Sequence, residues 1–315
     1  MARPRVEHTD TRAGFVLALV AYLFWGLMPF YMKAVAHIHV LEVLAHRIVW
    51  SVPIAAIVLL ILRRGSELKA AFRSPRTLGI ALVTAALATT NWGVFIYAVG
   101  ADRTLEAALG YYINPLFSVF LAAVFLGERL SRLQMVAIAL AACAVALVTW
   151  DAGGLPSVAL LGAGSWGLYA LSRRALTMEP NQAFTLEILL ISVPCIVFIG
   201  YSYYAGTSHF GPTGSADVGL LVLGGFVTAA PLMIYCNAAR GLKLSTIGMM
   251  QYITPTMVFL IAVFIFGEPL PPARAIAFAI IWVALALYSV SVYGNARRRS
   301  RDKAAIALEK IPVAD

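Results

Sequence analysis

The feature that most constrains the fold of this chain is a series of apolar runs, each about the length of a helix that spans the ~30 Å hydrocarbon layer of a bilayer. They extend over almost all of its 315 residues. Hydrophobic residues make up 61% of the chain and charged residues only 12%, which is too little charge for the surface of a soluble protein. The runs are too long for the strands of a membrane barrel and show no alternation. We therefore expect an all-α membrane protein.

Hydropathy predicts ten membrane-spanning helices, whose boundaries are defined to within several residues. The expected spans are 13–35, 40–62, 77–99, 105–126, 132–150, 157–176, 183–201, 218–239, 246–266 and 273–293. The chain thus divides into a terminal segment 1–12, five spans within 13–150, five more within 151–293, and a basic tail 294–315.

Lysine and arginine residues are concentrated at one alternate set of helix ends. All but four of the 24 lie within 3–12, 63–76, 129–132, 173–174, 240–243 and 297–310. Cytoplasmic loops carry an excess of these residues, so both termini are expected to be cytoplasmic, in a multi-pass protein of the cell inner (cytoplasmic) membrane. Because the basic residues do not gather on one folded face, the net charge of +9 gives no reason to expect a nucleic-acid partner.

Short motifs recur between the two halves at a nearly constant offset. The pairs are Phe24-Trp25-Gly26 with Ser165-Trp166-Gly167, Ser51-Val52-Pro53 with Ser192-Val193-Pro194, Ile96-Tyr97 with Ile234-Tyr235, Tyr112-Ile113-Asn114-Pro115 with Tyr252-Ile253-Thr254-Pro255, and Gly127-Glu128 with Gly267-Glu268. Each half has an odd number of spans, so the second repeat must cross the membrane upside down. Inverted repeats are typical of secondary transporters, which bind their solute near the midplane between the halves.

At these positions the chain resembles the EamA-type branch of the drug/metabolite transporter superfamily, and within it the RarD group. The segments that carry the likeness are Trp25-Gly26, Pro29-Phe30-Tyr31, 42–51, Asn91-Trp92-Gly93, Ile96-Tyr97-Ala98, 110–116 and 127–130. The second repeat departs from this pattern, since Thr254 stands where the first has Asn114, and Pro269 where it has Arg129. That departure argues against a site built symmetrically from both halves.

The resemblance implies a permease of ten helices, with the first, third, fourth, sixth, eighth and ninth around a central cavity. The group is associated by name with chloramphenicol sensitivity. We therefore expect an exporter of small amphipathic or amino-acid-like solutes, chloramphenicol among them, that works in the lipid bilayer. The sequence leaves open whether the chain forms a homo-oligomer.

Aromatic and amide side chains on the helices expected around the cavity are the candidate solute-binding residues. They are Trp25, Asn91, Tyr97, Tyr112, Asn114, Trp166, Tyr169, Tyr235, Asn237, Gln251 and Tyr252. The alternative is that tryptophan and tyrosine mark the membrane interfaces. That alternative is weaker for the two mid-span asparagines, Asn91 and Asn114, because a buried amide needs partners.

Ionisable residues inside spans are costly and are therefore functional candidates. Glu42, His46 and Arg47 lie in the second span, and Glu187 in the seventh. Glu42 and His46 are one helical turn apart and can interact, whereas Arg47 points elsewhere and needs another partner. The cluster is either a proton-coupling or anion-binding element or a structural anchor. Glu187 is either a titrating cavity group or a polar contact between helices.

Pro115 and Pro255 occupy matching points of the two repeats. A proline inside a membrane helix frees a backbone carbonyl, so these positions are candidate hinges for alternating access. The alternative is that they are static kinks that shape the bundle.

Two other classes of function compete with transport. A non-transporting membrane scaffold would not need mid-span polar residues. An intramembrane enzyme would need a catalytic constellation at one depth, which only Glu42 and His46 approach. We expect no cofactor, because the G-x-G-x-x-G pattern at 162–167 lies in an apolar span without a preceding strand, and no metal, because the cysteines lack ligand spacing.

Overall fold

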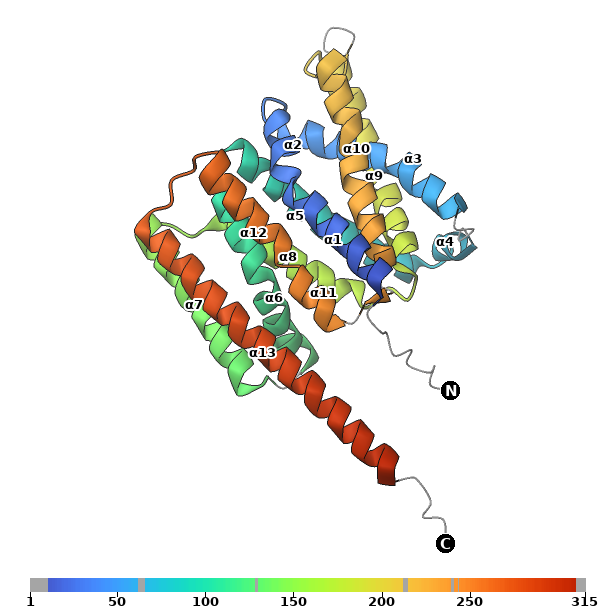
Figure 1. Cartoon of the computed structure of the whole chain (residues 1–315). Helices are drawn as coiled ribbons and strands as arrows, with labels where there is room; N and C mark the ends of the chain where they lie inside the picture. Colours follow the sequence, from blue (N-terminus) through green and yellow to red (C-terminus); the bar gives the residue numbers. More distant parts are fainter. Residues whose placement is uncertain are drawn as a thin grey trace.

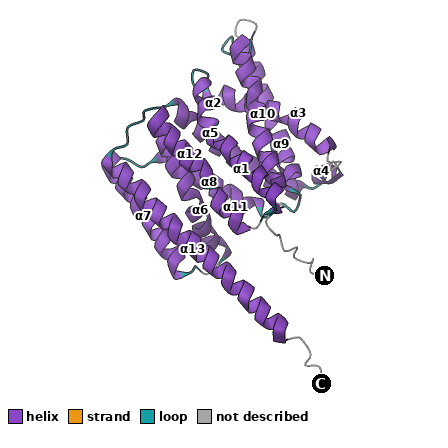
Figure 2. Cartoon of the chain, in the orientation of Figure 1, coloured by secondary structure: helices purple, strands orange, loops and turns teal. Residues whose placement is uncertain are grey.

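The computed structural model of the chain describes residues 11–61, 66–127, 130–211, 215–238, 241–242 and 244–309. All regular secondary structure in these ranges is helical (Figure 2), which confirms the expected all-α fold. Of the residues used above, those outside the described ranges are Arg3, Arg5, Arg63, Arg64, Glu128, Arg129, Arg240, Lys243 and Lys310.

The first half contains two short helices, α2 (Met28–Ala34) and α4 (Ser66–Ala71), among longer ones. The longer ones are α1 (Arg12–Gly26), α3 (Val40–Ile61), α5 (Pro75–Gly100), α6 (Thr104–Leu126) and α7 (Arg132–Ala152). The helices of the second half are α8 (Ser157–Arg173), α9 (Pro180–Tyr204), α10 (Ser215–Ala238), α11 (Leu244–Met250), α12 (Ile253–Leu260), the π-helix η2 (Ile261–Ile265) and α13 (Pro272–Glu309).

Eight helical stretches of the described chain are long and apolar enough to cross a membrane, so the protein is a multi-pass membrane protein. The first of them joins α1 and α2, and the others are formed by α3, α5, α6, α7, α9, α10 and α13. The remaining two expected spans are shorter than hydropathy suggested. Helix α8 has 17 residues, and the ninth expected span is divided among α11, α12 and η2.

The break in the ninth expected span has a local cause. Helix α11 ends at Met250, Gln251 and Tyr252 form a turn, and Pro255 is the third residue of α12. Proline lacks a backbone N–H and is tolerated in the first turn of a helix but not in its interior. Pro115 behaves differently, because α6 continues through it. The two matching prolines therefore do not occupy equivalent helical positions, since Pro255 lies in the first turn of α12 and Pro115 in the interior of α6.

Helices of the two halves interleave instead of forming separate bundles (Figure 1). Helix α1 packs on α10 and α12, α8 packs on α5 and α6, and α3 packs on α9 and α10. Helices α7 and α13 lie side by side at the edge of the molecule, and α13 runs on beyond the other helices (Figure 1).

The packing pattern is preserved when corresponding helices of the two halves are exchanged. The contact of α6 with α8 corresponds to that of α12 with α1, and the contact of α3 with α10 corresponds to that of α9 with α5. The turns after α6 and η2 also correspond. Gly127 and Gly267 take left-handed φ angles of 64° and 67°, a conformation that favours glycine.

Helices α3 and α10 approach each other to backbone contact. A side chain at Gly225 would collide with the backbone of Trp50, and one at Gly224 would lie 2.8 Å from Cγ of Arg47. Ser51 donates its hydroxyl to the Gly225 carbonyl at 3.2 Å. Small residues permit such close packing in membranes, and here the packing brings Arg47 against α10.

Candidate solute-binding site

Long-range polar contacts in the described structure run mainly between the two halves of the chain, along a boundary that we call the seam. Asn91 Nδ2 on α5 donates to the Gly162 carbonyl on α8 at 2.9 Å. The hydroxyls of Tyr112 on α6 and Thr256 on α12 are 2.8 Å apart. Polar groups in a bilayer need protein partners, and here those partners lie on the other half.

Arg47 is the most deeply enclosed charge on the seam. Its side chain comes from α3 and is only 4% exposed. Nε donates to the Thr228 hydroxyl on α10 at 2.9 Å, and Nη1 lies 4.0 Å from the sulfur of Met32. The Thr228 hydroxyl donates in turn to the Gly224 carbonyl at 2.7 Å. This arrangement fixes Nε, while Nη2 makes no hydrogen bond with the described residues.

Aromatic side chains from three other helices surround this guanidinium. Its carbon Cζ lies 5.9 Å from the ring centroid of Trp92 on α5, a distance typical of a cation–π contact. Tyr31 on α2 and Tyr111 on α6 are the titratable groups close enough to interact with its charge. Tyr31 donates its hydroxyl to the Leu220 carbonyl on α10 at 3.0 Å.

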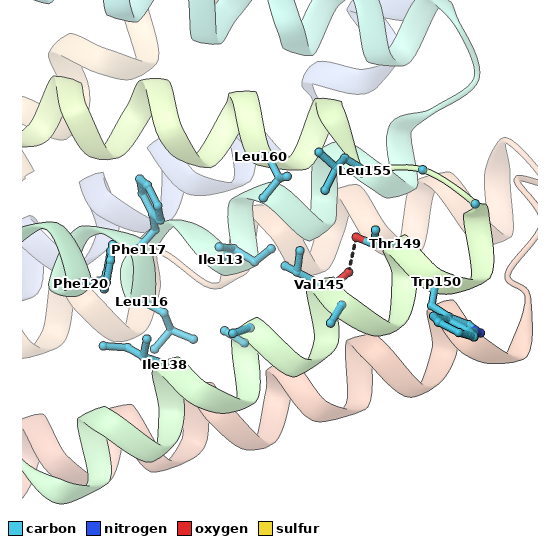
Figure 3. Close-up of a pocket in the computed structure, with 15 residues that line it drawn as sticks. Ile113, Leu116, Phe117, Phe120, Ile138, Val145, Thr149, Trp150, Leu155 and Leu160 are labelled. Carbon is cyan, nitrogen blue, oxygen red and sulfur yellow. Dashed lines mark hydrogen bonds between the residues drawn. The ribbon is translucent and has the colours of Figure 1, made fainter.

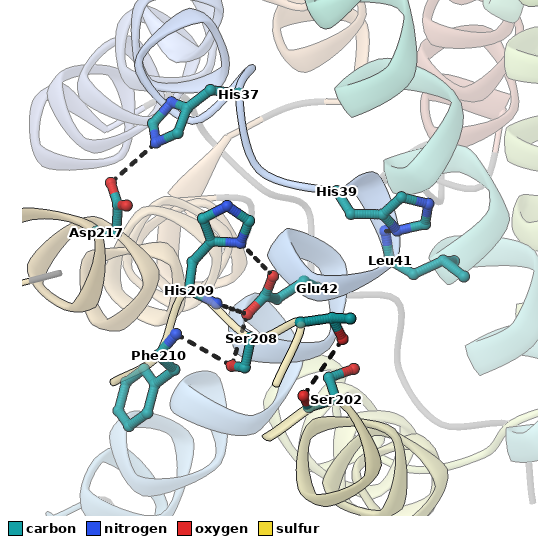
Figure 4. A network of polar contacts seen from close by, with 10 residues as sticks. His37, His39, Leu41, Glu42, Ser202, Ser208, His209, Phe210 and Asp217 are labelled. Atoms are coloured by element: carbon teal, nitrogen blue, oxygen red, sulfur yellow. Dashed lines mark hydrogen bonds and ion pairs between the residues drawn. The ribbon is translucent and has the colours of Figure 1, made fainter. Parts of the chain in front are cut away.

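Glu42 is engaged at the end of the molecule that carries His37, His39 and His209, which we call the histidine face (Figure 4). One carboxylate oxygen accepts from the Ser208 hydroxyl at 2.8 Å and the His209 backbone N–H at 2.7 Å. The other lies 2.8 Å from His209 Nδ1. The expected direct pair with His46, one turn away, is not formed, because the loop after α9 supplies better-placed donors.

A second contact closes the same face. His37, in the loop after α2, lies 2.9 Å from the carboxylate of Asp217 at the start of α10 (Figure 4). The rings of His37 and His209 are 6.1 Å apart. The contacts of His37 with Asp217 and with His209 both join the loop after α2, in the first half, to the second half.

His46 has an aromatic environment. Its Nδ1 accepts from Trp50 Nε1 at 3.2 Å, which assigns the proton of the neutral ring to Nε2. Its ring stacks on Phe210, with centroids 4.7 Å apart. Nε2 is buried without a partner in the described structure.

Glu187 is part of a contact between α8 and α9. Both of its carboxylate oxygens accept from Arg173 Nη1 at 2.8 Å, and Arg173 also donates to the Tyr169 hydroxyl and, at 2.9 Å, to the Pro180 carbonyl. Trp166 packs on Tyr169 with centroids 5.2 Å apart. Both carboxylate oxygens therefore accept a hydrogen bond within a contact between α8 and α9.

The two mid-span asparagines are both buried but differ in their partners. Asn91 is 4% exposed and donates to the second half, with Ser165 as a further contact at 3.4 Å. Asn114 is 8% exposed, and its Oδ1 has no hydrogen-bond partner among the residues described.

Trp25, Tyr235 and Tyr112 take part in aromatic clusters across the seam. Trp25 on α1 lies 5.5 Å from Tyr235 on α10, measured between ring centroids, and both contact Tyr22. Tyr112 packs edge-on against Trp282 of α13 at 6.3 Å. These candidates are therefore brought together with partners from the opposite half.

The remaining aromatic and amide candidates make none of these ring contacts. Tyr97 is 48% exposed. Asn237 is exposed and donates to the Met233 carbonyl of its own helix at 2.9 Å. Gln251 and Tyr252 form the turn between α11 and α12. The structure thus does not gather the eleven predicted residues into one site.

Glu268, which follows the π-helix, caps a helix of the other half. Its two carboxylate oxygens accept from the backbone N–H groups of Thr104 and Leu105, each at 2.8 Å. Nearby, burial disfavours the charge of Arg103, but the hydrogen bonds and charge of Glu106 prevail and raise the pKa of the guanidinium. The free N–H groups at the start of a helix stabilise negative charge, here that of the Glu268 carboxylate.

A large cavity of about 900 Å³ lies between α6, α7 and the start of α8 (Figure 3). Its lining is apolar, with Phe117, Ile138 and Leu160 among the side chains, and its Thr149 hydroxyl is bonded to the Val145 carbonyl at 2.8 Å. No predicted site residue lines it. An apolar groove at the edge of a membrane protein suits lipid chains better than a polar solute.

The described residues hold no group of three or more histidine, cysteine, aspartate or glutamate side chains placed to bind a metal. The glycine pattern at 162–167 lies inside helix α8, whereas a dinucleotide fingerprint requires a strand followed by a turn.

Membrane-crossing helices that interleave around a polar seam define a multi-pass membrane protein of the transporter class. Residues 12–150 match the EamA-like transporter family. Over 94% of its length the chain is 39% identical to an uncharacterised transporter of Vibrio cholerae, of which it covers 98%. Over 94% of its length it is also 38% identical to protein RarD of Escherichia coli, of which it covers 100%. The chain belongs to the EamA-like transporter family, in its RarD group.

A protein of known crystal structure has a similar fold. It is 20% identical, the TM-score is 0.54, and the match covers 89% of this chain and 98% of that one. At this level of identity the likeness concerns the fold alone.

Sequence reasoning missed four residues around Arg47, namely Tyr31, Trp92, Tyr111 and Thr228. They appeared in the sequence only as parts of motifs or not at all. Each lies on a different helix, and only the packing of these helices brings all four next to Arg47. One signal was available: an arginine in an apolar span needs a partner, and too few acids occur in the spans to supply one.

Proposed function

We propose that the chain is a secondary transporter that exports small amphipathic or amino-acid-like solutes, chloramphenicol among the candidates, by alternating access through a central cavity. The observation that carries this proposal is the seam. Buried polar groups such as Arg47, Asn91 and Tyr112 meet partners of the other half, so movement of one half against the other would remake their contacts and open a polar path.

The proposal includes ten spans arranged as two inverted repeats, with both termini on the cytoplasmic side of the inner membrane. Helix α8 and the segment from α11 to η2 would supply the two shorter spans. The exchange pattern of the helix contacts and the matching left-handed glycines at 127 and 267 support this arrangement. The broken ninth span also supports it, since discontinuous helices line transporter sites.

Within this scheme the seam residues Trp25, Asn91, Tyr112 and Tyr235 contribute to the solute path, and the turn before Pro255 is the hinge with the stronger structural support. Glu42 and His209 are the candidates for proton coupling, because the His209 side chain is 36% exposed at the histidine face while its carboxylate partner is buried.

The test is transport by the purified protein in proteoliposomes, with radiolabelled chloramphenicol and a panel of aromatic amino acids, with and without an imposed pH gradient. We expect saturable movement that exceeds protein-free vesicles and that the gradient accelerates. A double variant, Asn91→Ala with Asn114→Ala, should insert normally and transport more slowly. Failure of every solute to move would contradict the proposal and favour a scaffold. An unaltered rate in the double variant would exclude Asn91 and Asn114 from the solute path.

A further inference from the structure

We propose that Arg47 binds the carboxylate of the transported solute, and that the solute carries an aromatic or apolar body beside this anionic group. This inference rests on the proposed transport function and specifies its substrate class. It identifies a solute site that the predicted residues Trp25, Asn91 and Tyr112 do not themselves define.

The charge of Arg47 is buried. Arg47 is 4% exposed, and no carboxylate in the described part of the chain forms an ion pair with it. Glu42 is occupied by Ser208 and His209, and Glu187 by Arg173. A buried cation without a counter-ion is costly in any protein and more so in a membrane. A bound anion would remove that cost, which makes the site a receptor for negative charge.

The guanidinium of Arg47 has several N–H donors. Thr228 occupies only Nε of the guanidinium, and Nη1 has only the weak contact with Met32. The outer edge of the fork, which carries Nη1 and Nη2, therefore has no oxygen acceptor among the described residues. Arginine presents such an edge to a carboxylate with two parallel N–H···O bonds. The Thr228 bond holds the fork in one orientation before the solute arrives.

The surroundings of Arg47 are aromatic. Trp92 offers its ring to the guanidinium at 5.9 Å, and Tyr111 packs on Phe95 with centroids 5.5 Å apart. Aromatic faces of this kind favour a flat apolar body. A phosphate is a poorer match, because its second charge would need another cation, and the lysine on α2, Lys33, is paired with Asp102.

The experiment measures equilibrium binding of 3-phenylpropionate and of its neutral counterpart 3-phenylpropanamide to the full chain in lipid nanodiscs. The wild type should bind the carboxylate roughly 10- to 100-fold more tightly than the amide, as expected for charge-assisted hydrogen bonds. Arg47→Gln should abolish this preference. Arg47→Lys should keep the preference with lower affinity, and Trp92→Leu should weaken both ligands alike. Arg274→Gln, which removes one positive charge from the start of α13, is the matched control and should behave as the wild type.

A preference that survives in Arg47→Gln, or a wild type that binds the amide as tightly as the acid, would overturn the inference. If Arg47→Gln does not fold, Arg47→Lys decides, and an unchanged affinity there would overturn it equally. Failure of the inference is distinguishable from failure of the proposed function. Saturable transport of a carboxylate solute at the wild-type rate by Arg47→Gln would refute carboxylate binding by Arg47 and leave transport standing.

Discussion

The buried ionisable side chains of this protein divide into two kinds. Glu42 and Glu187 have donors on both carboxylate oxygens, so their charges are compensated within the fold. Arg47 has one hydrogen bond from Nε, and no carboxylate of the described residues pairs with it. A compensated charge holds helices together, whereas an uncompensated one is a site for something that the protein binds.

The Glu187–Arg173 pair gives a test at the scale of single residues. Glu187→Gln leaves Arg173 without its carboxylate, and we expect a loss of roughly 2–4 kcal/mol in the free energy of unfolding, near the range for breaking a buried pair. The double variant Arg173→Gln with Glu187→Gln should recover much of this loss. Thermal unfolding in detergent measures both. If the losses in the free energy of unfolding of the two single variants add up to the loss of the double variant, the two residues are not coupled.

The sequence could indicate which residues are candidates, but not which partner each would take. Glu42 and His46 are neighbours on a helix, yet Glu42 pairs with His209, a residue 167 positions away in the chain. Trp92 and Tyr111 could not be linked to Arg47, because that contact depends on how α3, α5 and α6 pack. Local periodicity contains no information on such contacts.

At the scale of elements, the spans were predictable because apolar runs of bilayer length allow little else. The expected boundaries of the third and fourth spans agree with α5 and α6 to within a few residues. The break in the ninth span was not predicted, since Gln251 and Tyr252 do not lower the hydropathy enough to mark a turn. Pro255 was a signal, but the equally placed Pro115 sits in a continuous helix.

The contact between α3 and α10 depends on Gly225. Gly225→Ala would place a methyl group against the Trp50 backbone, and we expect it to lower stability by about 1–3 kcal/mol, the usual cost of overpacking. Gly219→Ala on the same helix is the matched control, because a methyl group there meets nothing within 4 Å. Melting temperatures of the two variants in the same detergent provide the comparison. Equal effects would show that helix propensity, and not the close approach, decides.

At the scale of the whole molecule, the proposed alternating access would require the histidine face to open and close. We expect a disulfide between His37→Cys and Asp217→Cys, made in a background without the three native cysteines, to stop transport until a reductant is added. These positions now touch across the seam.

The control for this prediction is a second disulfide, between Ser131→Cys and Ser291→Cys. Their hydroxyl oxygens are 2.8 Å apart, and they join α7 to α13, a pair at the edge of the molecule. This link should leave transport intact. Loss of transport in the edge variant, or its persistence in the cross-linked face variant, would argue against opening and closing at the histidine face.

The unpaired charge of Arg47 has an electrical consequence. With its site empty, the carrier would hold one positive charge within the membrane, and a bound carboxylate would cancel it. A membrane potential acts on charge by about 2.3 kcal/mol for each elementary charge moved through 100 mV. The membrane potential would therefore act on the return of the empty carrier, which holds a net charge at this site. It would not act on the step that carries the solute, because the loaded site is neutral. The turnover rate would thus depend on the membrane potential.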